Sequence, residues 1–158
     1  MEILFVCTGN TCRSPMAEAM LRSAVEQDAT LAGVVARSAG LAAYAGDDMN
    51  PHSLRALREL GISPLPHRAA PLTDYTVQQA DLILTMQQHH AQAVLGAFPG
   101  AAGKVHTLKG YALGQEEASG PEGFLDIYDP YGQPYGVYIS CAKEIQECVR
   151  KLAERIKE

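Results

Sequence analysis

The chain has 158 residues, of which 47% are apolar and 20% are charged, and its formal net charge is −5. No stretch approaches the ~20 consecutive apolar residues of a membrane span, so we expect no association with a membrane. The acidic balance argues against a nucleic-acid partner, because such binding depends on a basic surface. The length predicts one domain over residues 1–158, large enough to bury its own core.

The N-terminus and the cysteines predict a cytoplasmic protein. The segment Met1–Leu4 lacks the basic stretch that opens a signal peptide. A chain of this length needs no disulfide framework. Two of its four cysteines, Cys7 and Cys12, lie in one short loop whose chemistry requires a free thiol. A reducing compartment fits these features.

Short apolar runs alternate with amphipathic helical patterns, which predicts an α/β domain whose parallel sheet carries helices on both faces. In chain order, strands are expected at Glu2–Val6, Val34–Arg37, Leu82–Thr85 and Val105–Leu108. Helices are expected at Pro15–Glu26, Pro51–Leu60, Thr73–Gln79, Gln88–Phe98 and Tyr138–Lys157. The last helix has the clearest period, since its apolar residues recur every three or four positions.

The first strand leads directly into residues 7–13, Cys-Thr-Gly-Asn-Thr-Cys-Arg, which we call the cysteine loop. Five residues between Cys7 and Arg13 are enough to wrap one tetrahedral anion with inward backbone N–H groups. Gly9 and Asn10 both tolerate the positive φ that such a curl needs. Arg13 supplies a planar fork for two phosphate oxygens. The sequence therefore predicts a phosphate-binding loop.

The helix after the cysteine loop favours the same function. Ser14 is a preferred N-cap residue and Pro15 suits the first helical position, so the positive end of this helix is expected to point at the bound anion. A helix N-terminus and an arginine both favour the thiolate form of a nearby cysteine. We therefore expect Cys7 to attack phosphorus as a nucleophile.

A long segment without helical period runs from Gly114 to Gly136 and is rich in glycine, proline, acidic residues and tyrosine. Loops of this length in small domains are usually functional or disordered. The part between Asp126 and Gly132 combines carboxylates with tyrosines, so we expect it to belong to the site.

Three motifs resemble the low-molecular-weight protein-tyrosine phosphatase family: Cys-Thr-Gly-Asn-Thr-Cys-Arg-Ser at 7–14, Ser-Ala-Gly at 38–40 and Asp-Pro-Tyr-Gly at 129–132. The resemblance covers nearly the whole chain. It implies a single three-layer domain, with a central four-stranded parallel sheet flanked by helices on both faces and the phosphate-binding loop after the first strand. It also implies a two-step reaction on phosphorylated proteins through a phosphocysteine, without a metal or other cofactor.

The resemblance assigns a role to each matching residue. Cys7 resembles the nucleophile and Arg13 the phosphate clamp. Asp129 resembles the general acid that protonates the leaving group and afterwards activates water. Asp126 is a rival acid, but Pro130 and Tyr131 match the family pattern around Asp129.

Other matching residues support the loop or bind substrate. Ser14 resembles the hydroxyl that hydrogen-bonds the thiolate, and Asn10 resembles the residue that holds the loop in its curl, with Ser38 as its partner. His67 is expected to support the loop from behind. The expected substrate-binding residues are Thr8, Gly9, Asn10, Thr11, Cys12, Ser14 and Tyr131.

Position 11 bears on the substrate. The tyrosine-specific members carry a bulky aliphatic residue there, whereas this chain has Thr11, like the subset similar to bacterial protein-arginine phosphatases. A small polar wall suits the flat, polar guanidinium of phosphoarginine better than an aliphatic one does. Tyr131 can stack on a guanidinium or flank a tyrosine ring. We expect phosphoarginine as substrate, with phosphotyrosine as the alternative.

Several alternatives stay open. Arsenate reduction needs further cysteines within reach of Cys7, but Cys141 and Cys148 lie on the apolar side of the last helix and are expected in the core. A phosphate-binding module without catalysis needs neither a nucleophile nor an acid. Cys12 is either a redox partner of Cys7 or a small space-filling residue. His89 and His90 lack a set of neighbouring metal ligands. We expect a monomer.

Overall fold

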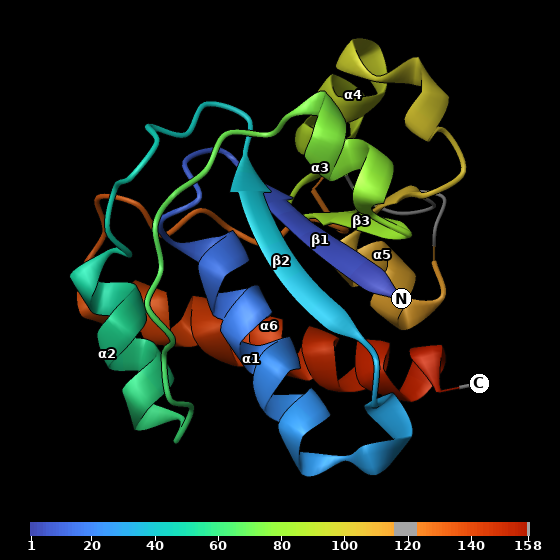
Figure 1. Ribbon diagram of the computed structural model, residues 1–158. Coiled ribbons are helices and arrows are strands. Elements are labelled where there is room, and N and C mark those ends of the chain that lie inside the picture. The colour runs from blue at the N-terminus through green and yellow to red at the C-terminus, as the bar shows by residue number, and fades with distance from the viewer. Residues whose placement is uncertain (116–122, 158) are drawn as a thin grey trace.

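The computed structural model describes residues 1–115 and 123–157. Its four strands form one parallel sheet in the order β2-β1-β3-β4 (Figure 1). The strands are β1 (Glu2–Cys7), β2 (Val35–Gly40), β3 (Leu82–Thr85) and β4 (Val105–Thr107). The helices are α1 (Arg13–Gln27), α2 (Pro51–Glu59), α3 (Asp74–Gln79), α4 (Gln88–Ala97), α5 (Leu108–Leu113) and α6 (Tyr135–Ile156). Short 3-10 turns lie at Ala29–Leu31 and Pro99–Ala101.

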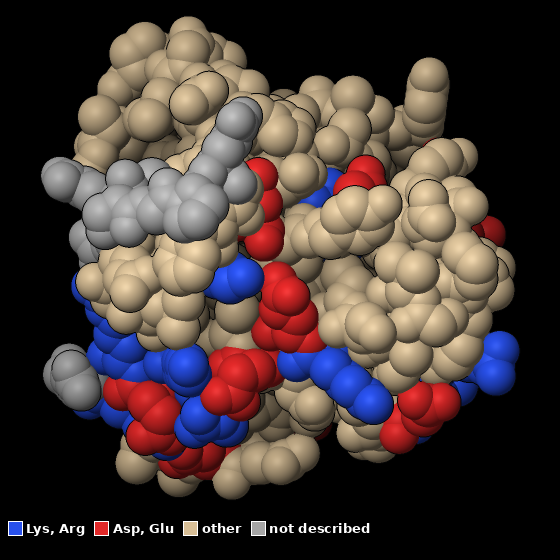
Figure 2. Space-filling model, turned by 180° about the vertical axis from the view of Figure 1, so that it is seen from behind, with Lys and Arg blue, Asp and Glu red and all other residues tan. Residues whose placement is uncertain are grey.

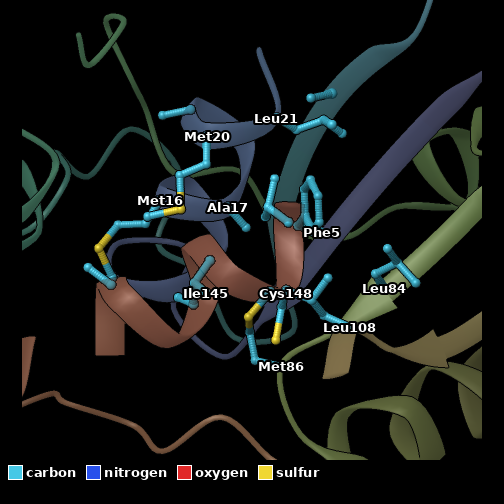
Figure 3. Close-up of a cluster of buried hydrophobic side chains, with 14 of the residues drawn as sticks. Phe5, Met16, Ala17, Met20, Leu21, Leu84, Met86, Leu108, Ile145 and Cys148 are labelled. Atoms are coloured by element: carbon cyan, nitrogen blue, oxygen red, sulfur yellow. The ribbon is translucent and has the colours of Figure 1, made fainter. Parts of the chain in front are cut away.

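The central strand β1 is buried on both faces, as strands of parallel sheets usually are. Ile3 and Phe5 pack with residues of α1, α2, α5 and α6 on one face, and Leu4 and Val6 pack with residues of α3 and α4 on the other. Figure 3 shows the larger of these clusters, in which Phe5 lies among side chains of α1 and α6. The expected four-stranded parallel sheet with helices on both faces is thereby confirmed.

Several predicted boundaries were wrong. β2 begins at Val35 and continues to Gly40, because its pairing with β1 runs as far as Cys7. α6 begins at Tyr135 instead of Tyr138. The short helix α5 was not predicted, since Gly110 lies in its middle and glycine weakens a helical pattern. A Cβ at Gly110 would lie 2.7 Å from Thr107 Oγ1, so close packing requires glycine there.

The outer side of α6 carries charges of both signs. Glu147 pairs with Arg150 and Lys151, and Lys157 pairs with Glu154 and with Asp28 at the end of α1. Figure 2 shows acidic and basic residues interspersed over the lower part of the face turned away from the viewer in Figure 1. Such exposed pairs contribute little to stability, about 0–1 kcal/mol each. None of the helices in the described ranges is both long and apolar enough to cross a membrane.

Candidate active site

The cysteine loop rests against the end of β2 through a close backbone approach at Gly40. A Cβ at this position would lie 2.6 Å from Thr8 O and 3.0 Å from Asn10 N, so no larger residue fits without moving the loop. Beyond Gly40, the backbone amides of Leu41 and Ala42 donate to Cys7 O and Thr8 O at 3.0 and 2.9 Å. The Ser-Ala-Gly motif therefore provides the surface on which the loop lies.

Asn10 holds the curl of the loop. It is fully buried and has a φ of 55°, a left-handed conformation that non-glycine residues rarely adopt. Its Oδ1 accepts from Ala70 N at 3.0 Å, and its carbonyl oxygen lies 2.7 Å from His67 Nε2. These contacts oppose the cost of about 1–3 kcal/mol for a strained backbone. Of the two loop residues expected to tolerate a positive φ, Asn10 adopts it and Gly9 does not.

Among the described residues, Ser38 forms no hydrogen bond with Asn10, which corrects the expected partnership. Its Oγ donates to Glu18 Oε1 of α1 at 2.5 Å, and Glu18 also pairs with Arg22. Ser38 therefore fastens β2 to α1, while the loop is supported from the side of His67 and Ala70.

Ser14 faces the buried sulfur of Cys7. Its Oγ accepts from Asn10 Nδ2 at 2.9 Å and lies 2.9 Å from Cys7 Sγ. Because Asn10 occupies an acceptor position of this hydroxyl, its proton is free to point at the sulfur. The predicted N-cap role of Ser14 was wrong: α1 already begins at Arg13, and Cys12 at the N-cap makes no capping hydrogen bond through its side chain. The hydroxyl of Ser14 thus interacts with the sulfur of Cys7 and does not cap α1.

The guanidinium of Arg13 is almost completely buried, with 2% of the residue exposed. Its Nη1 donates at 2.7 Å to Gln87 Oε1 and, also at 2.7 Å, to the backbone oxygen of Ile127. Its Nη2 lies 3.5 Å from Asp129 Oδ2. The end of β3 and the loop before α6 therefore fix the fork beside the cysteine loop.

The two candidate acids lie in different surroundings. Asp129 Oδ1 accepts from Tyr131 N at 3.0 Å, its other oxygen faces Arg13, and its side chain is 47% exposed. Asp126 Oδ1 instead accepts from Gln88 N at 2.7 Å, at the first turn of α4. Asp129 borders the pocket above the cysteine loop and Asp126 does not. This placement favours Asp129 as the proton donor.

A pocket of about 240 Å³ opens above the cysteine loop. Arg13 and the sulfur of Cys7 are buried in it, whereas Tyr131 at its edge is 71% exposed. Sequence reasoning missed Tyr44 and Asp47, which line the pocket from the segment after β2 and carry no recognisable motif. The lining residues are Cys7, Thr8, Gly9, Thr11, Cys12, Arg13, Ala42, Tyr44, Asp47, Asp129 and Tyr131.

The two thiols of α6, Cys141 and Cys148, do not suit a relay to Cys7. Cys141 and Cys148 belong to the large core cluster, which confirms the prediction. Burial raises the pKa of Cys141 to about 12 and that of Cys148 to about 11. Burial also raises the pKa of Cys12, whose sulfur lies 4.0 Å from the hydroxyl of Tyr138. Because the thiolate is the reactive form, Cys141 and Cys148 are poor nucleophiles.

His90 is a buried residue of the site that the sequence did not reveal. Its Nδ1 accepts from Gln87 N at 3.2 Å, so the proton belongs on Nε2, which lies 2.9 Å from Thr8 Oγ1. Burial, with a smaller contribution from Arg13, lowers the pKa of His90 to about 3. The neutral imidazole of His90 therefore connects Gln87, which accepts a hydrogen bond from Arg13, to Thr8 of the cysteine loop.

The low pKa of His90 predicts a loss of stability in acid. Below pH ~6.5 the unfolded chain protonates this histidine, whereas the folded protein does so only near pH 3. The contribution of His90 to the free energy of unfolding is fully present above pH ~6.5. It decreases by up to about 1.4 kcal/mol per pH unit as the pH falls toward 3. Urea unfolding between pH 7 and 5 should show this decrease in the free energy of unfolding for the wild type and for the exposed control His89→Gln, but not for His90→Gln. Equal slopes in all three proteins would contradict the prediction.

The comparisons with known proteins agree with this geometry. A family model, low molecular weight phosphotyrosine protein phosphatase, matches residues 2–158. The chain belongs to this family. It is 40% identical over 157 residues to the protein-arginine-phosphatase of Bacillus subtilis, covering 99% of this chain and 97% of that protein. It is 36% identical to the probable low molecular weight protein-tyrosine-phosphatase EpsP of Ralstonia nicotianae, covering 98% and 95%.

A solved structure is similar over the whole chain. It is the YwlE arginine phosphatase as a C7S mutant with a phosphorylated active site serine. Its TM-score is 0.88 at 38% identity, and the match covers 100% of this chain and 97% of that chain. The family thus includes members named protein-arginine-phosphatase and members named protein-tyrosine-phosphatase, the two specificities that position 11 was expected to distinguish.

Proposed function

We propose that this cysteine-dependent phosphatase hydrolyses phosphoarginine in proteins, as a monomer in the cytoplasm and without a cofactor. The observation that carries the proposal is Thr11, a small polar residue in the wall of the pocket that also holds Asp129. A guanidinium next to the phosphoryl group finds oxygen acceptors there instead of an aliphatic wall. Two relatives of similar length are named protein-arginine-phosphatases, at 40% and 38% identity.

The first step transfers the phosphoryl group to sulfur. The thiolate of Cys7 attacks phosphorus and forms a P–S bond while the P–N bond to the guanidinium breaks. Asp129 gives its proton to the departing nitrogen, so the product leaves as neutral nitrogen and not as an anion. Arg13 and the backbone N–H groups of residues 8–12 bind the equatorial oxygens.

The second step releases phosphate. Asp129, now a carboxylate, takes a proton from water, and the water oxygen attacks phosphorus as the P–S bond breaks. The electron pair returns to Cys7, where the hydroxyl of Ser14 lies 2.9 Å away to stabilise the thiolate. In this scheme Asn10 and His67 keep the loop in shape and Ser38 acts from a distance through α1. A module that only bound phosphate would need neither Cys7 nor Asp129.

The alternative substrate is phosphotyrosine. Tyr44 and Tyr131 both line the pocket and offer flat faces to a phenyl ring as well as to a guanidinium. Relatives named protein-tyrosine-phosphatases reach similar identities, 36% for EpsP of Ralstonia nicotianae and 39% for a solved structure from Bacillus subtilis. The aromatic residues therefore do not decide between the substrates, whereas position 11 does.

Thr11→Ile should shift the preference toward phosphotyrosine. The larger apolar side chain removes a hydroxyl and narrows the space beside the phosphoryl group, so the ratio of kcat/KM for phosphoarginine over phosphotyrosine peptides should fall about 10- to 100-fold. Thr11→Val, which keeps the size but not the hydroxyl, separates polarity from bulk and should give a smaller fall. An unchanged ratio in Thr11→Ile would refute the specificity argument.

We further propose that Cys7 and Cys12 form a reversible regulatory disulfide, although both are free thiols in the structure. Peroxide oxidises the Cys7 thiolate to a sulfenic acid, and the Cys12 thiol then displaces water to form the S–S bond. Peptide mass spectrometry after mild peroxide treatment should find this linkage, together with inactivation that dithiothreitol reverses. Cys12→Ser should lose the reversal. Absence of the linkage in inactivated wild-type protein would count decisively against the proposal.

A further inference from the structure

The pocket holds a second carboxylate besides that of Asp129. Asp47 lies on residues 41–50, which we call the rim segment, between β2 and α2, and it lines the pocket. In the part of the chain that the structure describes, the only hydrogen bonds of Asp47 are those of its backbone, and its carboxylate is in no ion pair. Both of its carboxylate oxygens are therefore available to a ligand.

The rim segment is fixed to the cysteine loop by its backbone. Its two ends donate to that loop at 2.9–3.0 Å through the amides of Leu41, Ala42 and Asn50. Between these ends, Gly46 N donates to Ala69 O at 2.9 Å, and Ala69 N donates to Asp47 O at 2.8 Å. The left-handed φ of 90° at Gly46 makes the turn possible. The backbone of Asp47 is thus held beside the pocket before any substrate arrives, which lowers the cost of binding.

The neighbouring acid, Asp48, is directed elsewhere. It forms an ion pair with Arg68 and borders a different depression, beside α2. Of two consecutive exposed aspartates, one lines the pocket above the cysteine loop and the other does not. The effect of Asp47 can therefore be separated from that of negative charge in this region.

The pocket has hydrogen-bond donors at its base and acceptors at its mouth. Arg13 and Cys7 at the base are 2% and 3% exposed, whereas Asp47 and Asp129 are far more open. Phosphoarginine has the matching distribution, with an anionic phosphoryl group beside a cationic guanidinium that carries several N–H groups. Asp129 serves one nitrogen as proton donor, and its Oδ1 already accepts from Tyr131 N. The remaining N–H groups need another acceptor, because an unpaired donor in a pocket weakens binding.

We propose that Asp47 is a specificity-determining residue, whose carboxylate accepts hydrogen bonds from the guanidinium of the phosphorylated substrate side chain. This inference rests on the proposed function. Phosphotyrosine has no N–H group beside its phosphoryl group, so it donates no hydrogen bond to Asp47 and gains no affinity from this carboxylate. Asp47 therefore adds to the preference for phosphoarginine that Thr11 provides. Both residues line the same pocket, Thr11 from the cysteine loop and Asp47 from the rim segment.

The test compares Asp47→Asn with its matched control Asp48→Asn. Two peptides with uncharged flanking residues carry phosphoarginine or phosphotyrosine at the same position, so the only substrate cation is the guanidinium. Asp47→Asn should lower kcat/KM for the phosphoarginine peptide about tenfold, mainly through KM, because a charge-assisted hydrogen bond becomes a neutral one. Its kcat/KM for the phosphotyrosine peptide should stay within about twofold, and Asp48→Asn should change neither value.

Each outcome has a distinct meaning. If the wild type prefers phosphoarginine and Asp47→Asn keeps that preference, or loses both activities equally, the inference about Asp47 is overturned and the proposed function stands. If the wild type prefers phosphotyrosine, the proposed function fails and the inference fails with it. An equal effect in Asp48→Asn would reduce the role of Asp47 to general surface charge and would also overturn it.

Discussion

Cys7→Ser should abolish turnover, with a loss of about 10⁴-fold or more in kcat. The serine hydroxyl holds its proton far more tightly than a thiol does and is a much worse nucleophile at neutral pH. Its position beside Ser14 and above the buried Arg13 is otherwise unchanged, so the variant should still bind phosphate. Phosphate release from a phosphoarginine peptide measures the loss, and isothermal titration with inorganic phosphate measures the retained binding.

Cys12→Ser is the matched control, since it makes the same change within the same loop. Burial raises the pKa of Cys12, so its thiol takes no part in the attack and the variant should keep most of the activity. Similar losses in both variants, with unchanged melting temperatures, would mean that the loop tolerates no serine and that the nucleophile is not identified. Turnover by Cys7→Ser above about 1% of the wild type would rule out covalent catalysis through this sulfur.

Local patterns sufficed for the sheet and for the position of the loop. The apolar run before Cys7 predicted β1, and the parallel order follows because each strand is separated from the next by helical sequence. The cysteine loop and Arg13 were found because their residue types and spacing carry chemistry, and Asp129 was found because the motif Asp-Pro-Tyr-Gly at 129–132 resembles that of the family. They meet in one pocket because the carboxyl ends of β1 and β3 lie at the same edge of the sheet as the loop before α6.

Contacts between distant segments could not be predicted in this way. His90 looks like any polar residue of α4 until the fold places its ring 2.9 Å from Thr8 Oγ1. Asp47 carries no motif, and its difference from Asp48 depends on one turn of the rim segment. The partnership of Ser38 with Asn10 failed for the same reason, because strand alternation does not say whether a side chain meets α1 or the loop.

Asp129→Asn should lower kcat about 10²- to 10³-fold for a phosphoarginine peptide, because an amide cannot protonate the leaving nitrogen. The loss should depend on the leaving group. An aryl phosphate such as p-nitrophenyl phosphate departs as a stabilised anion and needs less help, so the variant should lose clearly less activity on it. Kinetics on both substrates separate a missing proton donor from a distorted pocket, which would affect both alike.

Asp126→Asn is the control that separates the two carboxylates. Asparagine keeps an oxygen that can accept from Gln88 N, so the loop should stay attached to α4 and activity should remain within about threefold of the wild type. Asp129 lies 3.5 Å from the Arg13 fork that we propose as the phosphate clamp, whereas Asp126 accepts a hydrogen bond at the first turn of α4. A larger, leaving-group-dependent loss in Asp126→Asn than in Asp129→Asn would reverse the assignment, because only the residue that moves the proton responds to the basicity of the departing atom.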